Sequence, residues 1–360
     1  MANFDDVILA AKSLSRGNVE VKLIDDAYPT FLYRMAKLKN SDLISGGSES
    51  THAAWVVDDV EYNEFLFSCY INQVIGEKAL SLPFSAPKHT VTFDQAKAYC
   101  EANGAGYHLA TIAEYAAIAL WTRINSCMPH GNNNYGKDVT YPYETATEVS
   151  SSGSPIKTNR TATGSGPVSW NHSNLPYGIA DLNGNVYEWQ GGYRTVNGEI
   201  QLLPNNNAAV TGRNQLANST LWKAILQDGS LVAPGTENTL KWDYISAAPA
   251  SGSAVFQLNT ALDNPPADAA PSGAITFETL AAKAGVAIPD LLKQLTIMPV
   301  DSGSHNLDYF YMKNFGECLG FRGGAWSSAS STGVFGVFGN SPRSVAFISL
   351  GVRSAFITGA

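Results

Sequence analysis

The sequence predicts a mixed α+β fold, because two capped helices and several short β-rich runs alternate with long loops. Thr92 can cap a helix that ends at Gly104. A second helix is expected to begin at Thr111, which has capping-box spacing to Glu114. The final run, residues 319–356, alternates short apolar stretches with Gly and Ser, which is typical of strands and turns.

The N-terminal part of the chain is expected to form a small separate region. Residues 4–15 have the apolar spacing of a short amphipathic helix, and Val19–Ile24 has the pattern of a strand. A turn-rich stretch follows, which places a boundary near residue 48. We therefore expect residues 1–48 to serve attachment or oligomerisation, because the segment is too small for much of a core. Residues 49–360 form the main domain.

The composition excludes several classes of function. Only 15% of the residues are charged and the net charge is −8, which argues against nucleic acids and anionic membranes as partners. No segment approaches the apolar length of a transmembrane helix, and the acidic N-terminus does not resemble a secretory signal. Reduced, buried thiols and synthesis in a cytoplasm are expected, because four scattered cysteines form no CxxC pair: Cys69, Cys100, Cys127 and Cys318.

Long stretches of low charge separate the parts of the main domain. Residues 129–170 are rich in Asn, Gly, Ser and Thr and are expected to form surface loops. Residues at about 195–315 form a long insertion, within which a helix is expected around Thr276 to Ala284.

Two phrases indicate the fold more closely. GIADLNGNVYEW occupies residues 178–189, and FRGGAW at 321–326 is followed by GVRSAF at 351–356. Together with the helical pair, they resemble the formylglycine-generating-enzyme (sulfatase-modifying-factor) branch of the C-type lectin fold, over about residues 85–194 and 316–356. The resemblance implies a C-type-lectin-like fold of this type with a long insertion and a small N-terminal region.

The enzymes of this branch use a pair of C-terminal cysteines to bind copper and oxidise a substrate cysteine. Here residues 319–360 contain no cysteine, and Cys318 stands alone. A single thiolate cannot form a two-sulfur copper site, so we expect a protein that is not an enzyme. A copper oxidase of this type and a structural tail protein are the alternatives.

The end of the chain also resembles the variable proteins of diversity-generating retroelements, which include receptor-binding proteins of phage tails. Adenine-directed mutagenesis in that family does not produce Lys, Glu, Gln, Met or Trp, and residues 327–356 contain none of these. The variable region is therefore expected at about 321–356. The resemblance implies a fixed scaffold of Trp189, Arg322, Gly323, Gly324, Trp326, Gly333, Val334, Phe335, Gly351 and Arg353. It implies outward-facing, ligand-binding variable positions at Ala325, Ser327, Ser328, Ser330, Ser331, Gly336, Phe338, Asn340, Arg343, Ser344, Val345, Phe347 and Ser349.

Arginine and aromatic side chains dominate interface energetics, so Phe338, Arg343 and Phe347 are the expected hot spots. The alternative is that the two phenylalanines belong to the core. For Arg322 and Arg353 we expect structural roles, either pairing with a core acid such as Glu188 or binding backbone carbonyls.

The same resemblance suggests calcium as a cofactor, because some members bind it at positions that correspond to Asp181, Gly184, Val186 and Glu188. The alternative is that Asp181 caps a turn and Glu188 meets a core arginine. The histidines have no metal-ligand spacing, and no nucleophile-elbow motif is present.

Taken together, the sequence predicts a ligand- or receptor-binding protein, an adhesin of a phage or prophage tail. Its partner would be a protein or cell-surface receptor of a host, reached from a virion tail or the cell exterior. Multivalent display on a homo-oligomer, with a trimer as one option, would raise its affinity.

Overall fold

The computed structural model describes residues 4–246, 255–265 and 272–359. Residues 1–3 of the expected N-terminal region, residues 247–254 and 266–271 of the insertion, and residue 360 lie outside the described residues. The helices among the described residues are α1 (Asp5–Leu14), α2 (Asn40–Leu43), α3 (Phe93–Glu101), α4 (Ile112–Ile124) and α5 (Asp290–Gln294). Single 3-10 turns occur at η1 (Ala53–Trp55), η2 (Val168–Trp170), η3 (Asn207–Ala209), η4 (Phe277–Thr279) and η5 (Ala329–Ser331).

One antiparallel sheet joins the two ends of the chain. Its order is β1-β2-β5-β22-β8, so the C-terminal strand lies between strands from the first third of the sequence. Its members are β1 (Val19–Ile24), β2 (Tyr28–Ala36), β5 (Glu64–Ser68), β22 (Ser354–Phe356) and β8 (Tyr107–Leu109). Strand β2 pairs with β5 from residue 32 to residue 36, so hydrogen bonds cross the boundary expected near residue 48.

A second, larger sheet contains the segment that the sequence marks as variable. Its main path is β14-β13-β12-β11-β19-β20-β18-β17, and β15, β16 and β21 join it at the side. From the centre outward on one side lie β11 (Tyr187–Val196), β12 (Glu199–Leu202), β13 (Lys223–Ile225), β14 (Leu231–Val232), β15 (Lys241–Tyr244) and β16 (Phe256–Asn259). On the other side lie β19 (Glu317–Arg322), β20 (Val337–Ser341), β18 (Tyr309–Met312) and β17 (Gly273–Thr276), while β21 (Leu350–Gly351) pairs with β11.

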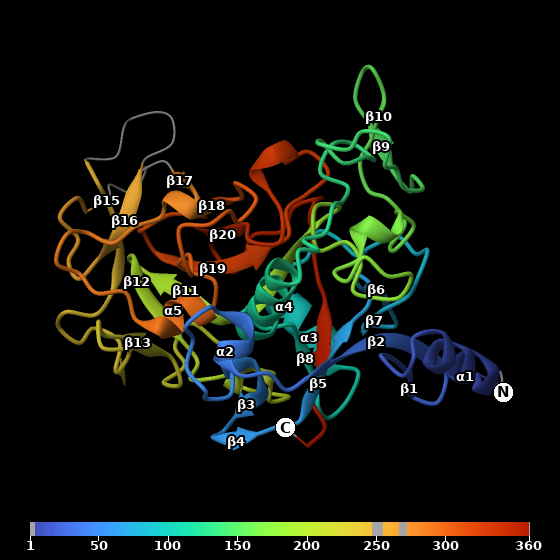
Figure 1. Ribbon diagram of the computed structural model, residues 1–360, viewed down its shortest axis with the longest axis horizontal. Coiled ribbons are helices and arrows are strands. Elements are labelled where there is room, and N and C mark those ends of the chain that lie inside the picture. Colours follow the sequence, from blue (N-terminus) through green and yellow to red (C-terminus); the bar gives the residue numbers. More distant parts are fainter. Residues whose placement is uncertain (1–3, 247–254, 266–271, 360) are drawn as a thin grey trace.

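Short hairpins make up the remaining strands of the described chain. They are β3 (Val56–Val57) with β4 (Val60–Glu61), β6 (Gln73–Ile75) with β7 (Lys78–Leu80), and β9 (Ser151–Ser152) with β10 (Lys157–Thr158). The last hairpin projects from the body, within the expected loop region 129–170 (Figure 1).

Helix α4 lies near the middle of the molecule, between the strands of the insertion and the loop region (Figure 1). It is buried along nearly its whole length, and Tyr115 on it is fully buried. The predicted caps of both central helices are confirmed. The Thr92 side chain accepts a hydrogen bond from the Gln95 N–H, and the Thr111 side chain accepts one from the Glu114 N–H.

The helix predicted around Thr276 to Ala284 is wrong. Strand β17 ends at Thr276, and only the single turn η4 follows it. The backbone there is committed to sheet pairing, because β17 pairs with β18 and the Leu258 N–H donates to the Ala281 carbonyl. Tertiary hydrogen bonds thus override the local preference for helix.

The insertion is part of the larger sheet. It supplies β12 next to β11 on one side and β18 next to β20 on the other, so it flanks the variable segment. All four cysteines are free and buried, as predicted. Within the described residues, no helix has the length and apolar character needed to cross a membrane.

Candidate ligand-binding surface

The sheet register places a row of aromatic side chains under the variable segment. Strands β19 and β20 are antiparallel with Phe321 opposite Phe338, and β18 runs parallel to β20 with Tyr311 beside Phe338. Residues that are paired across neighbouring strands project from the same face of a sheet. These three rings therefore lie side by side on one face.

Phe338 is the centre of this cluster. Its ring stacks on Tyr311 with centroids 4.7 Å apart and on Phe321 at 5.5 Å, and Tyr187 meets it edge-on at 4.5 Å. Phe347 packs against Tyr187 and Phe321 at 6.0 Å and 5.9 Å. We call these five residues the aromatic floor. They provide a rigid apolar surface that loses little conformational entropy on binding.

Hydroxyl and amide groups surround the aromatic floor. Together they enclose an open hollow of about 490 Å³, which we call the aromatic hollow. Six of the thirteen predicted variable positions line it: Ser327, Ser328, Ser331, Phe338, Asn340 and Phe347. The structure thus brings nearly half of the predicted set to one place.

Ser328 connects the rim to the floor. Its hydroxyl is 2.9 Å from the Tyr187 hydroxyl, and it accepts a hydrogen bond from the Ala325 N–H. The Ser331 hydroxyl donates to the Ser328 carbonyl at 2.6 Å. Burial raises the pKa of Tyr187, which keeps its hydroxyl protonated and able to donate.

Two buried arginines hold the frame beneath this surface, in the two structural roles expected for them. Arg353 forms a paired contact with Glu188, with Nε 2.6 Å from Oε2 and Nη2 2.8 Å from Oε1. Arg322 donates through Nη2 to the carbonyls of Leu295 and Thr296 at 2.9 and 3.1 Å.

The remaining scaffold residues are also buried. Trp189 donates from its indole to the Val91 carbonyl, and Trp326 packs beside Val186. At Gly324 φ is +81°, and a Cβ built there would lie 1.7 Å from Thr332 Oγ1. This position therefore accepts only glycine without rearrangement.

A buried carboxylate, that of Asp308, fixes the backbone of the variable segment near Phe335. Asp308 accepts a hydrogen bond from the Phe335 N–H at 2.8 Å and one from the Asn306 side chain. Burial raises the pKa of Asp308 to about 7, although the Phe335 N–H opposes this shift. Gly333 is required beside it, because a Cβ there would lie 2.5 Å from the carboxylate.

Three predicted variable positions do not face outward, and for these the expectation is wrong. Ala325 is 1% exposed, Gly336 is buried, and Phe338 is 7% exposed. Ala325 and Gly336 lie where the loop turns back over Asp308 and Ser328, so their backbones are enclosed. Phe338 is covered by its ring neighbours, yet its edge still lines the aromatic hollow.

Arg343 does not lie on the aromatic hollow as an open hot spot. Its Nε is 2.7 Å from Glu317, its Nη1 is 2.9 Å from Asp94, and its Nη2 donates to the Gln215 carbonyl. The guanidinium is therefore already used to tie the variable segment to α3 and to the insertion. The expectation failed because these partners are distant in the sequence.

The other predicted variable positions lie around the hollow. Ser344 is exposed, while Val345 and Ser349 are half-buried. Val345 packs against the core beneath the aromatic floor. Ser330 is exposed and lines a different cavity on the other side of η5.

The calcium set suggested by the resemblance does not fit this chain. Both oxygens of Glu188 accept from the guanidinium of Arg353, so a cation would have to displace a buried cation. Asp181 accepts from the Gly164 N–H, and burial raises the pKa of Asp181 to about 6. Asp181 and Glu188 therefore have the structural roles that were the alternative to calcium binding. Gly184 and Val186 are the other two residues of the suggested calcium set.

Sequence reasoning missed three residues of the aromatic floor. Tyr187, Phe321 and Tyr311 were not expected to bind a ligand, although each is adjacent to Phe338. The three consecutive aromatics at residues 309–311 are a strand signal that could have revealed Tyr311. Its pairing with β20 depends on the tertiary structure alone.

Comparison with known proteins agrees with this architecture. Residues 58–229 match the family model of the sulfatase-modifying factor enzyme 1-like domain, FGE-sulfatase. The predicted α+β, C-type-lectin-like fold is thereby confirmed. The match includes the helical pair and the GNVYEW phrase, and it ends before the RGGAW phrase.

Several solved structures resemble this chain at low sequence identity. The Major Tropism Determinant P3c and U1 variants are each 10% identical, with TM-scores of 0.31. For each variant, the match covers 91% of this chain and 62% of the variant. This chain thus spans about 62% of the length of either variant. Treponema denticola variable protein 1 is 11% identical with a TM-score of 0.32, and 94% of this chain matches 98% of it. No curated protein matches the chain.

The surroundings of Cys318 determine how reactive its thiol can be. Cys318 is 2% exposed, and burial raises the pKa of its thiol to about 11. A thiol of this kind is neutral at physiological pH, whereas copper and substrates react with the thiolate. The Cys318 thiol also donates to the Phe315 carbonyl at 3.7 Å.

Proposed function

We propose that this protein is a non-enzymatic ligand-binding protein whose C-terminal segment forms the contact surface for a target on a host cell. The observation that carries the proposal is the convergence of six predicted variable positions on one aromatic hollow. A rigid aromatic floor supplies contact area, and small hydroxyl side chains at the rim adapt to different targets. We infer a receptor-binding role in a phage or prophage tail, at the virion tail or the cell exterior.

The scaffold supports this role, because the residues that hold the contact surface in place are not themselves part of that surface. The pair of Arg353 with Glu188 and the carbonyl contacts of Arg322 lie beneath the surface. Substitutions at exposed positions such as Ser327 therefore leave these contacts intact. Such a separation allows side chains at the rim to change without loss of the fold.

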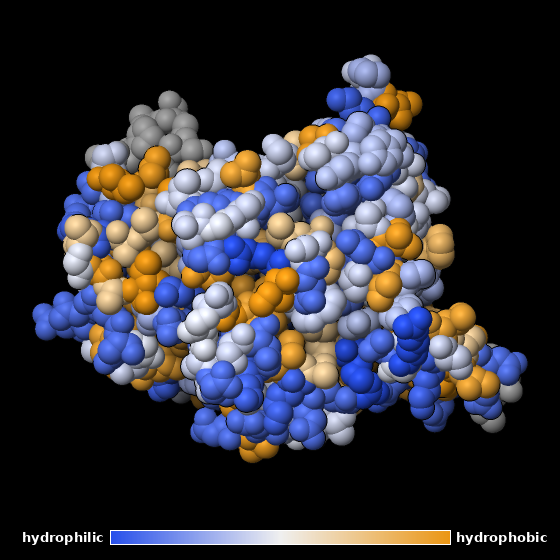
Figure 2. Space-filling model, in the orientation of Figure 1, coloured by the Kyte–Doolittle hydropathy of each residue, from blue (hydrophilic) through white to orange (hydrophobic). Residues whose placement is uncertain are grey.

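Display on an oligomer would raise the affinity of a modest contact patch. The N-terminal segment 1–48 is the proposed attachment or oligomerisation element. Helix α1 buries none of its residues, and Val7, Leu9 and Leu14 on it are between 41% and 78% exposed. Figure 2 shows apolar surface at the projecting end that holds α1. A homo-oligomer, with a trimer among the options, would cover it.

The first experiment tests the position of the contact surface. Fluorescently labelled protein is applied to a panel of bacterial cells, and bound fluorescence is compared between the wild type and Ser327→Trp. The new indole would fill the aromatic hollow, and we expect binding to fall at least about tenfold. Ser344→Trp is the matched control, because Ser344 is exposed in the same segment but does not line the hollow. Equal losses in both variants, or none in Ser327→Trp, would contradict the proposal.

The second experiment tests diversification. The DNA beside the gene is sequenced, and we expect a near-copy of the final codons with adenines at the rim positions, next to a reverse-transcriptase gene. A structural tail protein, the alternative, would lack this copy.

For the oxidase alternative, a titration with Cu(I) is decisive, since tight stoichiometric binding of copper would support an oxidase.

A further inference from the structure

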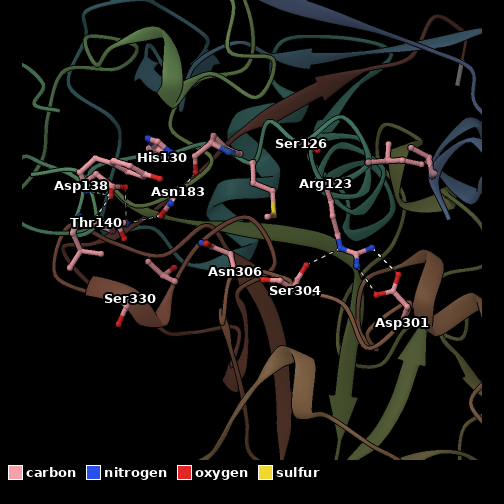
Figure 3. Close-up of a pocket in the computed structure, with 18 of the residues that line it drawn as sticks. Arg123, Ser126, His130, Asp138, Thr140, Asn183, Asp301, Ser304, Asn306 and Ser330 are labelled. Atoms are coloured by element: carbon pink, nitrogen blue, oxygen red, sulfur yellow. Dashed lines mark hydrogen bonds and ion pairs between the residues drawn. The ribbon is translucent and has the colours of Figure 1, made fainter. Parts of the chain in front are cut away.

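A second cavity lies on the other side of the turn η5 from the aromatic hollow. Its volume is about 600 Å³, which is within the usual range of sites for small molecules. Its walls come from the end of α4, the loop after it, the loop at 301–306 and the variable segment. Figure 3 shows His130, Asp138, Thr140 and Asn183 on one side, and Arg123 with Asp301 on the other.

Hydrogen bonds fix the polar wall of this cavity. Asp138 is 3% exposed and accepts from the N–H groups of Gly131, Thr140 and Tyr141 and from the Asn133 side chain. The Asn133 amide also donates to the Asn183 side chain at 3.3 Å. The carboxylate therefore holds the loop in one shape before any ligand arrives, which reduces the entropic cost of binding.

The groups that face a ligand here are mainly neutral donors and acceptors. Thr140, Ser304 and Ser330 are exposed hydroxyl residues of the lining. The single lining arginine, Arg123, is already paired with Asp301 at 2.6 Å. No free cationic group of the described lining remains to bind a phosphate or a carboxylate.

One further lining residue has an unused buried hydroxyl. Thr332 is 1% exposed, and its Oγ1 has no hydrogen-bond partner among the residues that the structure describes. This Oγ1 lies against Gly324, because a Cβ built on Gly324 would be 1.7 Å from it, so Thr332 shapes the wall and is not one of the groups that reach a ligand.

A pair of aromatic rings completes the cavity. His130 and Tyr141 stack with centroids 4.0 Å apart and planes 14° apart, and both line the cavity. His130 Nδ1 lies 2.9 Å from Glu144, which fixes the ring pair in place. A flat aromatic wall beside hydroxyl and amide groups suits a ligand that has both an apolar C–H face and several hydroxyls.

We propose that this cavity is a calcium-independent binding site for a neutral, polyhydroxylated ligand, a glycan. A peptide is the less favoured occupant, because peptides are usually bound by a free strand edge, an apolar helix groove or an arginine cluster. The described lining contains none of these, since it consists of loops, the ends of α2 and α4, and the turn η5.

The glycan site is separate from the surface proposed above for the host target. Ser330 lines the glycan cavity, whereas the adjacent Ser331 lines the aromatic hollow. The ridge between them is tied to the cavity wall, because the Ala329 N–H donates to the Asn133 carbonyl at 2.8 Å. The two sites can therefore be blocked one at a time.

The experiment uses the full chain and an immobilised panel of neutral polysaccharides: a glucan, a galactan, a mannan and a chitin oligomer. We expect the wild type to bind at least one of them in the presence of a calcium chelator. Thr140→Trp places an indole in the cavity and is expected to weaken binding at least about tenfold. Thr147→Trp is the matched control, because Thr147 is exposed in the same loop and does not line the cavity.

Ser327→Trp separates this inference from the proposed function, because it fills the aromatic hollow and should leave glycan binding unchanged. Competition with the component monosaccharides distinguishes a site for single sugars from a site for the polymer. Absence of binding to every neutral glycan at millimolar concentration overturns the inference, as does unchanged binding by Thr140→Trp. Preference for a displayed peptide library over the glycans also overturns it.

A second measurement covers the case in which Thr140→Trp does not fold. In the ¹⁵N-labelled wild type, the side-chain amide signals of Asn133 and Asn183 are followed while the bound glycan is added. Both amides lie in the cavity wall, so we expect their signals to shift. Binding without any shift of these signals places the ligand elsewhere and overturns the inference.

Discussion

Arg353 and Glu188 form a fully buried ion pair between residues that are 165 positions apart in the sequence. The pair connects the GNVYEW phrase to the GVRSAF phrase, and Arg353 also donates to the carbonyls of Ser68 and Ala180. A single side chain thus joins three segments that are distant in the sequence, beneath the proposed binding surface.

We expect Arg353→Met to lower the free energy of unfolding by about 3–5 kcal/mol, because it leaves a buried carboxylate without its partner. Chemical denaturation measures the loss. The double variant Arg353→Met with Glu188→Leu is the control, and it should recover part of the stability. If the double variant is as unstable as the sum of the two single variants, the pair does not act as a unit.

Phe338→Ala should destabilise the protein by about 3–5 kcal/mol, because the ring is covered by Tyr311, Phe321 and Tyr187. Loss of target binding in this variant would therefore not identify a contact residue. Ser327→Trp, at an exposed position, should keep the wild-type melting temperature while it blocks the hollow. A small change in stability for Phe338→Ala would show that the aromatic floor is not part of the core.

Arg343→Ala is expected to cost about 1 kcal/mol of stability, since its half-buried guanidinium joins Glu317 and Asp94. High salt should reduce the difference from the wild type. Cell binding by this variant, measured below its melting temperature, should remain. A selective loss of binding with unchanged stability would restore Arg343 as a contact residue.

Gly324→Ala should destabilise the variable segment. The left-handed backbone alone costs about 1–2 kcal/mol for a residue with a Cβ. In addition, the new methyl group would overlap Thr332 Oγ1. Gly316→Ala is a useful comparison, because φ there is +66° and no atom lies within 4 Å of its Cβ position. We expect thermal unfolding to show the larger loss for Gly324→Ala, and equal losses would contradict the steric argument.

The stability of the fold should depend on pH through Asp308. Burial raises its pKa from 3.8 to about 7 in the folded state, so between these values the folded protein holds a proton that the unfolded chain has released. The contribution of Asp308 is therefore fully present below about pH 4 and is lost as the pH rises through about 7. Relative to Asp308→Asn, the wild type should become less stable over this interval, as measured by denaturation at a series of pH values. A constant difference would show that the carboxyl is ionised throughout.

The sequence by itself determined the elements that depend on local rules. The two helix caps at Thr92 and Thr111 follow from side chains that satisfy free N–H groups within one turn. The pairing of Arg353 with a core acid was also foreseeable, because Glu188 and Arg353 belong to the two phrases that carry the resemblance. A buried cation needs a partner, and few acids were available.

Only the tertiary structure decided which exposed-looking residues reach solvent. The variable segment contains serine, glycine and phenylalanine in patterns that suit either a surface or a core. Phe338 is covered because β18, supplied by the insertion, places Tyr311 beside it. Arg343 is engaged because Glu317 and Asp94 come from strands and helices elsewhere in the chain. Such pairings arise from long-range hydrogen bonds between strands, and no local pattern in the sequence specifies them.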